Sequence, residues 1–201
     1  MLLSSLPGFE AMRPALVERA FDSPDWIFEV KYDGLRGFAC SDGQNTVLLS
    51  PNGKVYTGFP LLVRAIADAL GGVPAVLDGE IVHLDEAGRP AYGPLVHRKL
   101  PQHFYAFDLV MLNHEDLRPL PLFERKQLLE DIIAGARFVR YARHVPERGT
   151  ALYDAACSHN LEGIVGKWRH GAYACNALTP AWLQVRNPNY AQTGRKRRAG
   201  A

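Results

Sequence analysis

Short apolar segments typical of β-strands follow one another along most of this chain, and they constrain its fold more than any other feature. They are rich in aromatic and β-branched residues and are separated by turn residues, as at Pro51-Asn52-Gly53. Several come in adjacent pairs, which favours antiparallel or mixed sheets over a regular doubly wound sheet. We therefore expect an α+β fold. The predicted strands cover residues 26–32, 35–40, 46–50, 74–84, 103–112, 137–145, 162–168 and 181–186.

Helical spacing of apolar residues is confined to a few segments between these strands. It predicts helices over residues 59–70, 121–134 and 151–159, with Thr150 as the N-cap of the last. Residues 87–101 are interrupted by prolines and glycines and are predicted to form a loop. The helices are too few to alternate with every strand, which again favours α+β.

Composition places the chain among ordinary soluble proteins. Its 201 residues suit one domain, and 47% hydrophobic with 22% charged residues is typical of a globular core and surface. No apolar stretch is long enough to span a membrane, and the first residues do not resemble a signal peptide. Three scattered cysteines fit a reducing compartment, so we expect a cytoplasmic protein without membrane contact.

The net charge of +2 conceals a basic end. Four consecutive cations, Arg195 to Arg198, lie within residues 193–201, which we interpret as a basic C-terminal tail. Such a tail can neutralise nucleic-acid phosphates, although a charged end is as often simply solvated.

The segment EVKYDGLR, residues 29–36, carries the sharpest chemical signal. Lys31 stands at a strand end before an Asp-Gly turn, which would present its amine to a cleft. A lysine that attacks phosphorus must be neutral, so its pKa has to fall below the usual value of about 10.4. Arg36, Lys167 and Arg186 would lower it if they share the pocket. Taken alone, the segment also fits a surface hairpin with a solvated lysine.

Two further segments place polar or aromatic residues inside strands. LDGEIV, residues 77–82, puts Glu80 in an apolar strand, where a carboxylate needs a partner, a metal or access to water. FYAFDL, residues 104–109, places Tyr105 and Phe107 on one strand face, where an aromatic ring can stack on a purine. A plain hydrophobic core explains Tyr105 at least as well as a ligand does, and Phe107 less well.

The last two segments combine an acid, an amide and cations. EGIVGK, residues 162–167, begins with Glu162 and ends with Lys167, which alternation does not place on one strand face. Both still meet a ligand if one lies at the entry of the strand and the other at its exit. In WLQVRN, residues 182–187, Gln184 and Arg186 do share a face.

These five segments, in this order and at these separations, resemble the covalent nucleotidyltransferase superfamily, and most closely the ATP-dependent DNA ligases of the small bacterial type. The flanking run DLRPLPLFER at 116–125 and the closing run at 182–190 are similar as well, so the resemblance covers roughly residues 10–192. It implies the ligase adenylation fold, with antiparallel or mixed sheets flanked by helices and an ATP cleft between them. Residues 1–192 would form this adenylation (nucleotidyltransferase) domain.

The resemblance also implies a reaction, with ATP as co-substrate and Mg²⁺ as the metal ion. Lys31 would take AMP from ATP and pass it to the 5′-phosphate of nicked double-stranded DNA, after which the nick is sealed. Glu162 and Glu80 would hold the metal ion. The ATP-binding residues would be Glu29 at the adenine amino group, Lys31, Arg36 and Glu80 near the ribose, Phe107 stacked on adenine, Lys167 at the phosphates and Arg186 at the α-phosphate.

The chain departs from the family pattern in three places. Gln184 stands where a lysine is usual, and Pro51 stands where an arginine usually touches DNA phosphate. No OB-fold sequence follows residue 192, although full ligases continue into one. A minimal enzyme, a charging half that works with a separate OB-fold or DNA-clamping protein, and a degenerating paralogue all remain open. An RNA ligase or capping-type enzyme, and a non-catalytic nucleotide- or nucleic-acid-binding paralogue, are the alternative functions.

Overall fold

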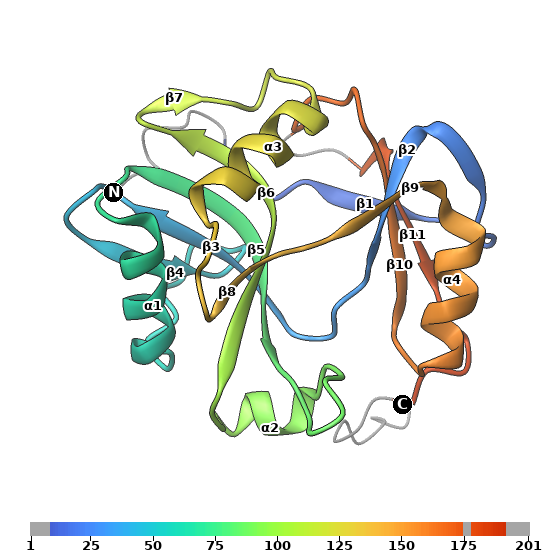
Figure 1. Cartoon of the computed structure of the whole chain (residues 1–201), viewed down its shortest axis with the longest axis horizontal. Helices are drawn as coiled ribbons and strands as arrows, with labels where there is room; N and C mark the ends of the chain where they lie inside the picture. Colours follow the sequence, from blue (N-terminus) through green and yellow to red (C-terminus); the bar gives the residue numbers. More distant parts are fainter. Residues whose placement is uncertain (1–8, 175–177, 192–201) are drawn as a thin grey trace.

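Two β-sheets face each other, and the chain passes between them more than once (Figure 1). The computed structural model describes residues 9–174 and 178–191. The predicted basic tail, and Cys175, lie outside these residues. The elements agree with the expected α+β class, and the strands of both sheets pair mostly antiparallel.

The first sheet has five strands in the order β1-β11-β10-β2-β9. The helix α4 (Gly149–Ser158) packs on it, beside β2 and β10. A small core between them includes Phe28, Ala156 and Ile164. The strands are β1 (Arg13–Leu16), β2 (Asp22–Val30), β9 (His144–Arg148), β10 (Gly163–Trp168) and β11 (Leu178–Arg186).

The second sheet has six strands, with β4-β3-β5-β6-β7 in order and β8 paired to β6. The helices α1 (Pro60–Leu70) and α3 (Leu122–Ile132) pack against it, and the short helix α2 (Tyr92–Val96) follows β5. Its strands are β3 (Leu35–Ser41), β4 (Thr46–Leu49), β5 (Ala75–His83), β6 (Gln102–Leu112), β7 (Glu115–Asp116) and β8 (Val139–Tyr141).

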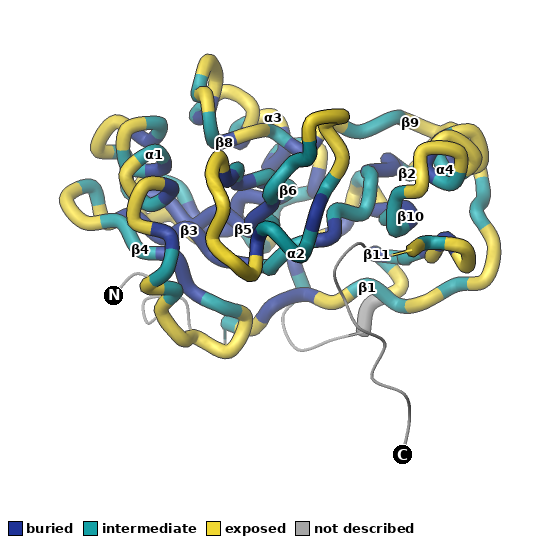
Figure 2. Tube along the Cα trace, turned by 90° about the horizontal axis from the view of Figure 1, so that it is seen from below, coloured by how far each residue is buried: buried dark blue, intermediate teal, exposed yellow. Residues whose placement is uncertain are grey.

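The strands of the second sheet are mostly buried, because other parts of the chain pack against both of its faces (Figure 2). One face packs on α1, with Ile66, Leu77 and Phe104 in a single core cluster. The opposite face contributes Phe38 and Val110 to a second cluster. The outer turns and the outer sides of the helices are exposed (Figure 2). Among the described residues, no helix combines the length and apolarity that crossing a bilayer requires.

The Asp33-Gly34 turn does not close a hairpin, which was the alternative interpretation of this segment. β2 belongs to the five-stranded sheet and β3 to the six-stranded one, so residues 31–34 cross from one sheet to the other (Figure 1). Gly34 permits this crossing because a Cβ there would lie 2.2 Å from the carbonyl oxygen of Ile81. Lys31 is therefore placed between the sheets, where both can supply partners for its side chain.

Other local predictions also need correction. The predicted strand 137–145 is interrupted, and its two parts, β8 and β9, pair in different sheets, so residues 142–143 make another crossing. The proline-rich loop contains α2, and β1 was not predicted. Thr150 does not cap α4, because the N-cap is Arg148 and the helix starts one residue before Thr150. The Thr150 N–H instead donates to Asp22 Oδ1 at 2.8 Å.

Candidate active site

A pocket of about 270 Å³ lies between the two sheets at the crossing that carries Lys31. Both sheets contribute to it: Glu80 and Phe107 come from β5 and β6, and Lys167 comes from β10. The structure thus collects residues from all five sequence segments into one cavity. The complete lining is Pro14, Glu29, Val30, Lys31, Tyr32, Arg36, Glu80, Phe107, Val165, Lys167, Trp182 and Gln184.

Lys31 is held in this pocket by an ion pair. Its Nζ lies 2.8 Å from Glu162 Oε2, and both side chains remain about one-fifth exposed, at 23% and 22%. Its backbone N–H donates to the Gly163 carbonyl at 2.9 Å, so the crossing is bonded to the start of β10. The lysine is fixed at its backbone but reachable at its amine, which is the combination that a nucleophile needs.

Glu29 lies deeper and is surrounded by two lysines. Lys126 Nζ donates to one carboxylate oxygen, and Lys167 Nζ lies 2.7 Å from the other. Lys126 also donates to the Ala142 carbonyl at 3.0 Å. All three side chains are almost completely buried, so each charge depends on the others. We call Glu29, Lys126 and Lys167 the buried charge cluster.

Lys126 was not predicted as a site residue. It lies in α3, outside the five segments, and its ammonium sits 4.3 Å from the centre of the Tyr141 ring. The available signal was the rarity of lysine in a chain that prefers arginine, together with the position of this lysine within an amphipathic helix.

Lys167 is enclosed by aromatic rings on the pocket side. Its ammonium lies 4.3 Å from the ring centres of both Phe107 and Trp182 and donates to the Phe107 carbonyl at 3.3 Å. Burial lowers the pKa of Lys167, while the neighbouring Glu29 carboxylate raises it. This wall of the pocket therefore combines two aromatic rings with a cation. Such a wall suits a ligand that has both a flat, electron-rich ring and an anionic group.

Arg36 lines the pocket but is already bound from behind. Its guanidinium makes a two-pronged contact with Asp78, at 3.0 and 2.6 Å, and donates to the Met12 carbonyl at 2.7 Å. Tyr173 donates to the same carboxylate at 2.7 Å. These bonds fix the plane of the guanidinium, so Arg36 has a defined orientation before any ligand arrives.

Glu80 differs from the other acids of the pocket. Burial raises the pKa of its carboxyl to about 8, although Lys31 and Arg36 act in the opposite direction. It has no hydrogen-bond partner within the described part of the chain. A buried acid in this condition is stabilised by any cation that binds beside it.

The residues fit a magnesium ion only together with a ligand. Within residues 9–174 and 178–191, no group of three or more His, Cys, Asp or Glu side chains could hold a metal by itself. Glu162 nevertheless lies close enough to raise the pKa of Glu80, and Glu162 also forms the ion pair with Lys31. Magnesium commonly binds one or two carboxylates and takes its remaining oxygens from phosphates and water.

Arg186 is not brought into the pocket. Its side chain is exposed, and it is absent from the residues that line the cavity. Gln184, two residues earlier on β11, lines the pocket and lies opposite Val165 of β10. The position facing the cavity therefore carries an uncharged amide, and the cation of this segment faces solvent.

The chain matches the family model described as "ATP dependent DNA ligase domain" over residues 11–186. It is 35% identical over 190 residues to the multifunctional non-homologous end joining protein LigD of Pseudomonas aeruginosa, covering 90% of this chain and 22% of that protein. It is 30% identical over 191 residues to DNA ligase C1 of Mycolicibacterium smegmatis, covering 84% of this chain and 55% of the relative.

A solved structure gives the same indication. A mycobacterial DNA ligase D complexed with ATP and MES superimposes with a TM-score of 0.79 at 28% identity, over 88% of this chain and 60% of that one. The present chain spans only about a fifth of the LigD proteins it matches, 22% of their length. With a family model that covers nearly every described element and a fold shared with a ligase domain, this chain belongs to the ATP-dependent DNA ligase domain family.

Proposed function

We propose that this chain charges Lys31 with AMP from ATP and transfers that AMP to the 5′-phosphate of nicked double-stranded DNA. The observation that carries the proposal is the position of the Lys31 amine, 2.8 Å from Glu162 in a pocket shared with Glu80, Phe107 and Lys167. A surface hairpin with a solvated lysine does not explain why both sheets contribute charged groups around this amine.

The charging step exchanges one bond for another. The lone pair of Lys31 Nζ attacks the α-phosphorus of ATP, a nitrogen–phosphorus bond forms, and the bond to the pyrophosphate oxygen breaks. The amine must first lose its proton, which requires its ion pair with Glu162 to open. The ion pair opens once Glu162 is engaged elsewhere, and the proton released by Lys31 then passes to solvent.

We propose for the remaining residues the roles that the resemblance implies, and their positions in or beside the pocket support these roles. Phe107 offers a ring on which adenine can stack, and Glu29 lines the same pocket, where it contacts Lys126 and Lys167. Glu29 would approach the adenine amino group. Arg36, already oriented by Asp78, would contact the ribose and later the nick phosphate. Lys167 would contact the phosphates.

Glu80 and Glu162 would hold Mg²⁺, which neutralises charge on the phosphate oxygens during the transfer. The raised pKa of Glu80 supports this assignment, because its carboxylate form needs a nearby cation near neutral pH. Arg186 would act at the α-phosphate only after a rearrangement of its exposed side chain. Residues 1–192 would form the adenylation unit, working in the cytoplasm on nicked DNA.

The proposal is tested by incubating the full chain with ATP labelled in its α-phosphate and with magnesium. We expect an acid-labile adduct of one AMP, mapped to Lys31 by mass spectrometry, and none with Lys31→Ala. Lys54→Ala, which changes an exposed lysine on a turn, is the matched control. A nick-sealing assay then follows AMP to the DNA, and competition with nicked RNA separates DNA from RNA as substrate. Failure of the adduct to form, or equal labelling of Lys31→Ala, rejects the charging role.

One observation favours a second candidate, a nucleotide-binding module without catalysis. Gln184 occupies the pocket, and Arg186 faces solvent, so β11 supplies no cation to the cavity in this conformation. Tight ATP binding without pyrophosphate release would support that candidate. The buried charge cluster and the reachable amine of Lys31 support the enzyme instead, because binding alone has no use for a nucleophile.

A further inference from the structure

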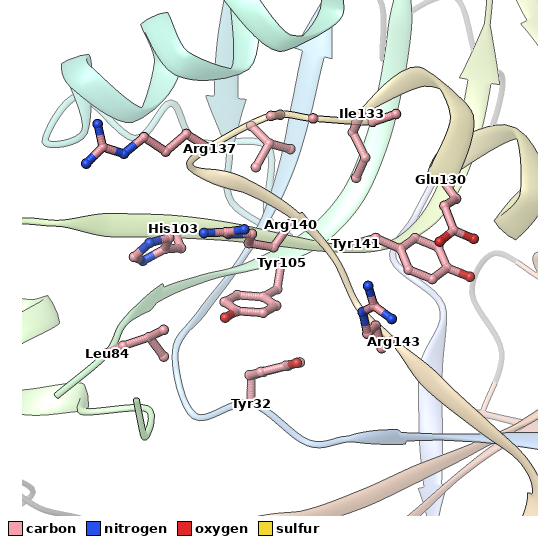
Figure 3. A pocket seen from close by; sticks show the side chains of 14 residues that line it. Tyr32, Leu84, His103, Tyr105, Glu130, Ile133, Arg137, Arg140, Tyr141 and Arg143 are labelled. Carbon is pink, nitrogen blue, oxygen red and sulfur yellow. The ribbon is translucent and has the colours of Figure 1, made fainter. Parts of the chain in front are cut away.

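A second and larger pocket, of about 740 Å³, lies beside the first and shares Tyr32 with it. It is bordered by both crossings, because Tyr32 belongs to the first and Arg143 to the second. Figure 3 shows Arg137, Arg140 and Arg143 around this cavity, with Tyr105 and then Tyr32 below Arg140. We call it the arginine pocket.

The strand register places the arginine pocket on the same sheet face as the active site. Arg36 on β3 lies opposite Glu80 on β5, and Glu80 lies opposite Tyr105 on β6. Tyr105 in turn lies beside Arg140 on β8. Cross-strand partners project their side chains to the same face of a sheet. One row of side chains therefore runs across β3, β5, β6 and β8 from the nucleotide-binding residues to Arg140. The arginine pocket extends the catalytic face toward the edge strand β8.

The cations of this pocket outnumber its acids. Arg137, Arg140 and Arg143 are exposed, and none forms an ion pair within residues 9–174 and 178–191. The acid among the lining residues is Glu130. Burial, followed by the charge of Arg140, lowers the pKa of His103, so this ring is neutral near pH 7. Two positive charges thus remain in excess.

The two aromatic rings separate the pockets. Tyr32 and Tyr105 are stacked, with ring centres 4.2 Å apart. Tyr32 lines both cavities, whereas Tyr105 lines the arginine pocket. These rings therefore separate a nucleotide in the active site from the arginines, whereas a polynucleotide strand that crosses the open face of the sheet can reach them. Guanidinium groups without acidic partners are well suited to phosphate oxygens.

We propose that the arginine pocket binds the sugar–phosphate backbone of the nicked polynucleotide, next to the charged Lys31. This inference rests on the proposed function and names where its second substrate is held. Arg140 and Arg143 each contact a backbone phosphate. Arg137 rests over the ring of Phe138, 5.1 Å from its centre, and has a secondary role.

The test uses the full chain, its Arg140→Gln, Arg143→Gln and double variants, and a fluorescent nicked duplex that carries a 5′-phosphate. Binding is measured by anisotropy over a range of salt concentrations. The slope of log K against log salt should fall by about one for each arginine removed. The double variant should bind roughly tenfold more weakly at moderate salt, the loss expected for charge-assisted contacts to phosphate.

Arg64→Gln is the matched control. Arg64 is exposed on α1, and α1 packs against the face of the sheet opposite Tyr105. Its removal should leave both slope and affinity unchanged. Lys31 labelling by ATP, measured on every variant, should equal that of the parent chain, which separates this inference from the charging role.

Two results would overturn the inference while leaving the charging role intact. The first is that Lys31 labelling is normal but the arginines do not matter for DNA. In that case the double variant binds the duplex as well as the parent chain does, or the parent chain itself does not bind the duplex at low salt. The other is a raised KM for ATP, or a slower reversal of charging by added pyrophosphate, in the double variant. That second pattern would assign the arginines to the polyphosphate of ATP.

Discussion

The buried charge cluster and the arginine pocket hold their cations in opposite ways. In the cluster, Lys126 and Lys167 share the carboxylate of Glu29, and all three are shut away from solvent. In the arginine pocket, Arg140 and Arg143 are exposed and have no acidic partner among the described residues. The two regions lie on either side of Tyr141, whose ring packs under Lys126 and also lines the arginine pocket.

This difference shows that some charged residues beside a site stabilise the fold, whereas others remain available to bind a ligand. Paired buried charges define positions, because separating them leaves an uncompensated charge in a low-dielectric interior. Unpaired exposed charges contribute little to the fold and remain available for an incoming anion. The cluster should therefore respond to mutation in stability, and the arginines in binding.

The largest effect is expected for Glu29→Gln, which leaves two lysines buried without their carboxylate. We expect the free energy of unfolding to fall by about 3–5 kcal/mol, measured by urea denaturation. Asp85→Asn, which breaks the exposed pair with Arg89, is the control and should leave the free energy of unfolding nearly unchanged. Equal losses in the two variants would remove the distinction between buried and exposed charge on which the comparison depends.

Gln184→Lys tests whether the pocket can use an added cation. A charge-assisted contact to phosphate that forms in the transition state should raise the rate of Lys31 labelling by about tenfold. Arg186→Gln should change that rate by no more than about fivefold, because its side chain is exposed and outside the cavity. A larger loss with Arg186→Gln than gain with Gln184→Lys would show that β11 rearranges when ATP binds.

Glu80→Gln tests the acid that has neither a lysine partner nor a hydrogen bond within the described chain. The folded pKa of about 8 exceeds the ordinary value of 4.5, so the folded state holds this proton more tightly than the unfolded state. The stability from the protonated form is complete below pH 4.5 and is lost as the pH rises through 8. The variant should lose this part of the pH dependence in thermal unfolding without ligand, and an unchanged profile would contradict the raised pKa.

The smallest effect on stability is expected in the arginine pocket. Arg140→Gln should change the free energy of unfolding by no more than about 0.5 kcal/mol, since the side chain is exposed and unpaired in the described structure. Urea denaturation at low and high salt checks this, with Arg64→Gln beside it. A clear destabilisation would mean that Arg140 is part of the framework, as the cluster is.

The sequence predicted the strands and helices well where the apolar pattern was regular. The helix expected at 59–70 is observed at Pro60–Leu70, and the strand expected at 103–112 is observed at Gln102–Leu112. What failed was the assignment of neighbours. A hairpin at Asp33-Gly34 and a crossing between sheets have the same local residues, and the choice depends on the packing of Gly34 against Ile81.

The candidate site was predictable to the extent that its residues lie in recognisable segments. Lys31, Glu80, Phe107 and Lys167 line one pocket, and the roles that the resemblance implies for them stay predictions. Lys126 was missed because a lysine within a helix has no spacing signature, and its role depends on a carboxylate 97 residues away. The exposure of Arg186 also escaped prediction, since strand alternation groups it with Gln184 but does not tell where the cavity ends.

The crossing at residues 31–34 has a consequence for the charged protein. Lys31 is joined through its backbone to β10 of one sheet, whereas the aromatic ring available to adenine, Phe107, belongs to the other. AMP bonded to this lysine and stacked on that ring would link the two sheets, through a covalent bond on one side and a stacking contact on the other. Charging would thus stiffen the molecule as well as activate it, and discharge onto DNA would let the two layers relax together.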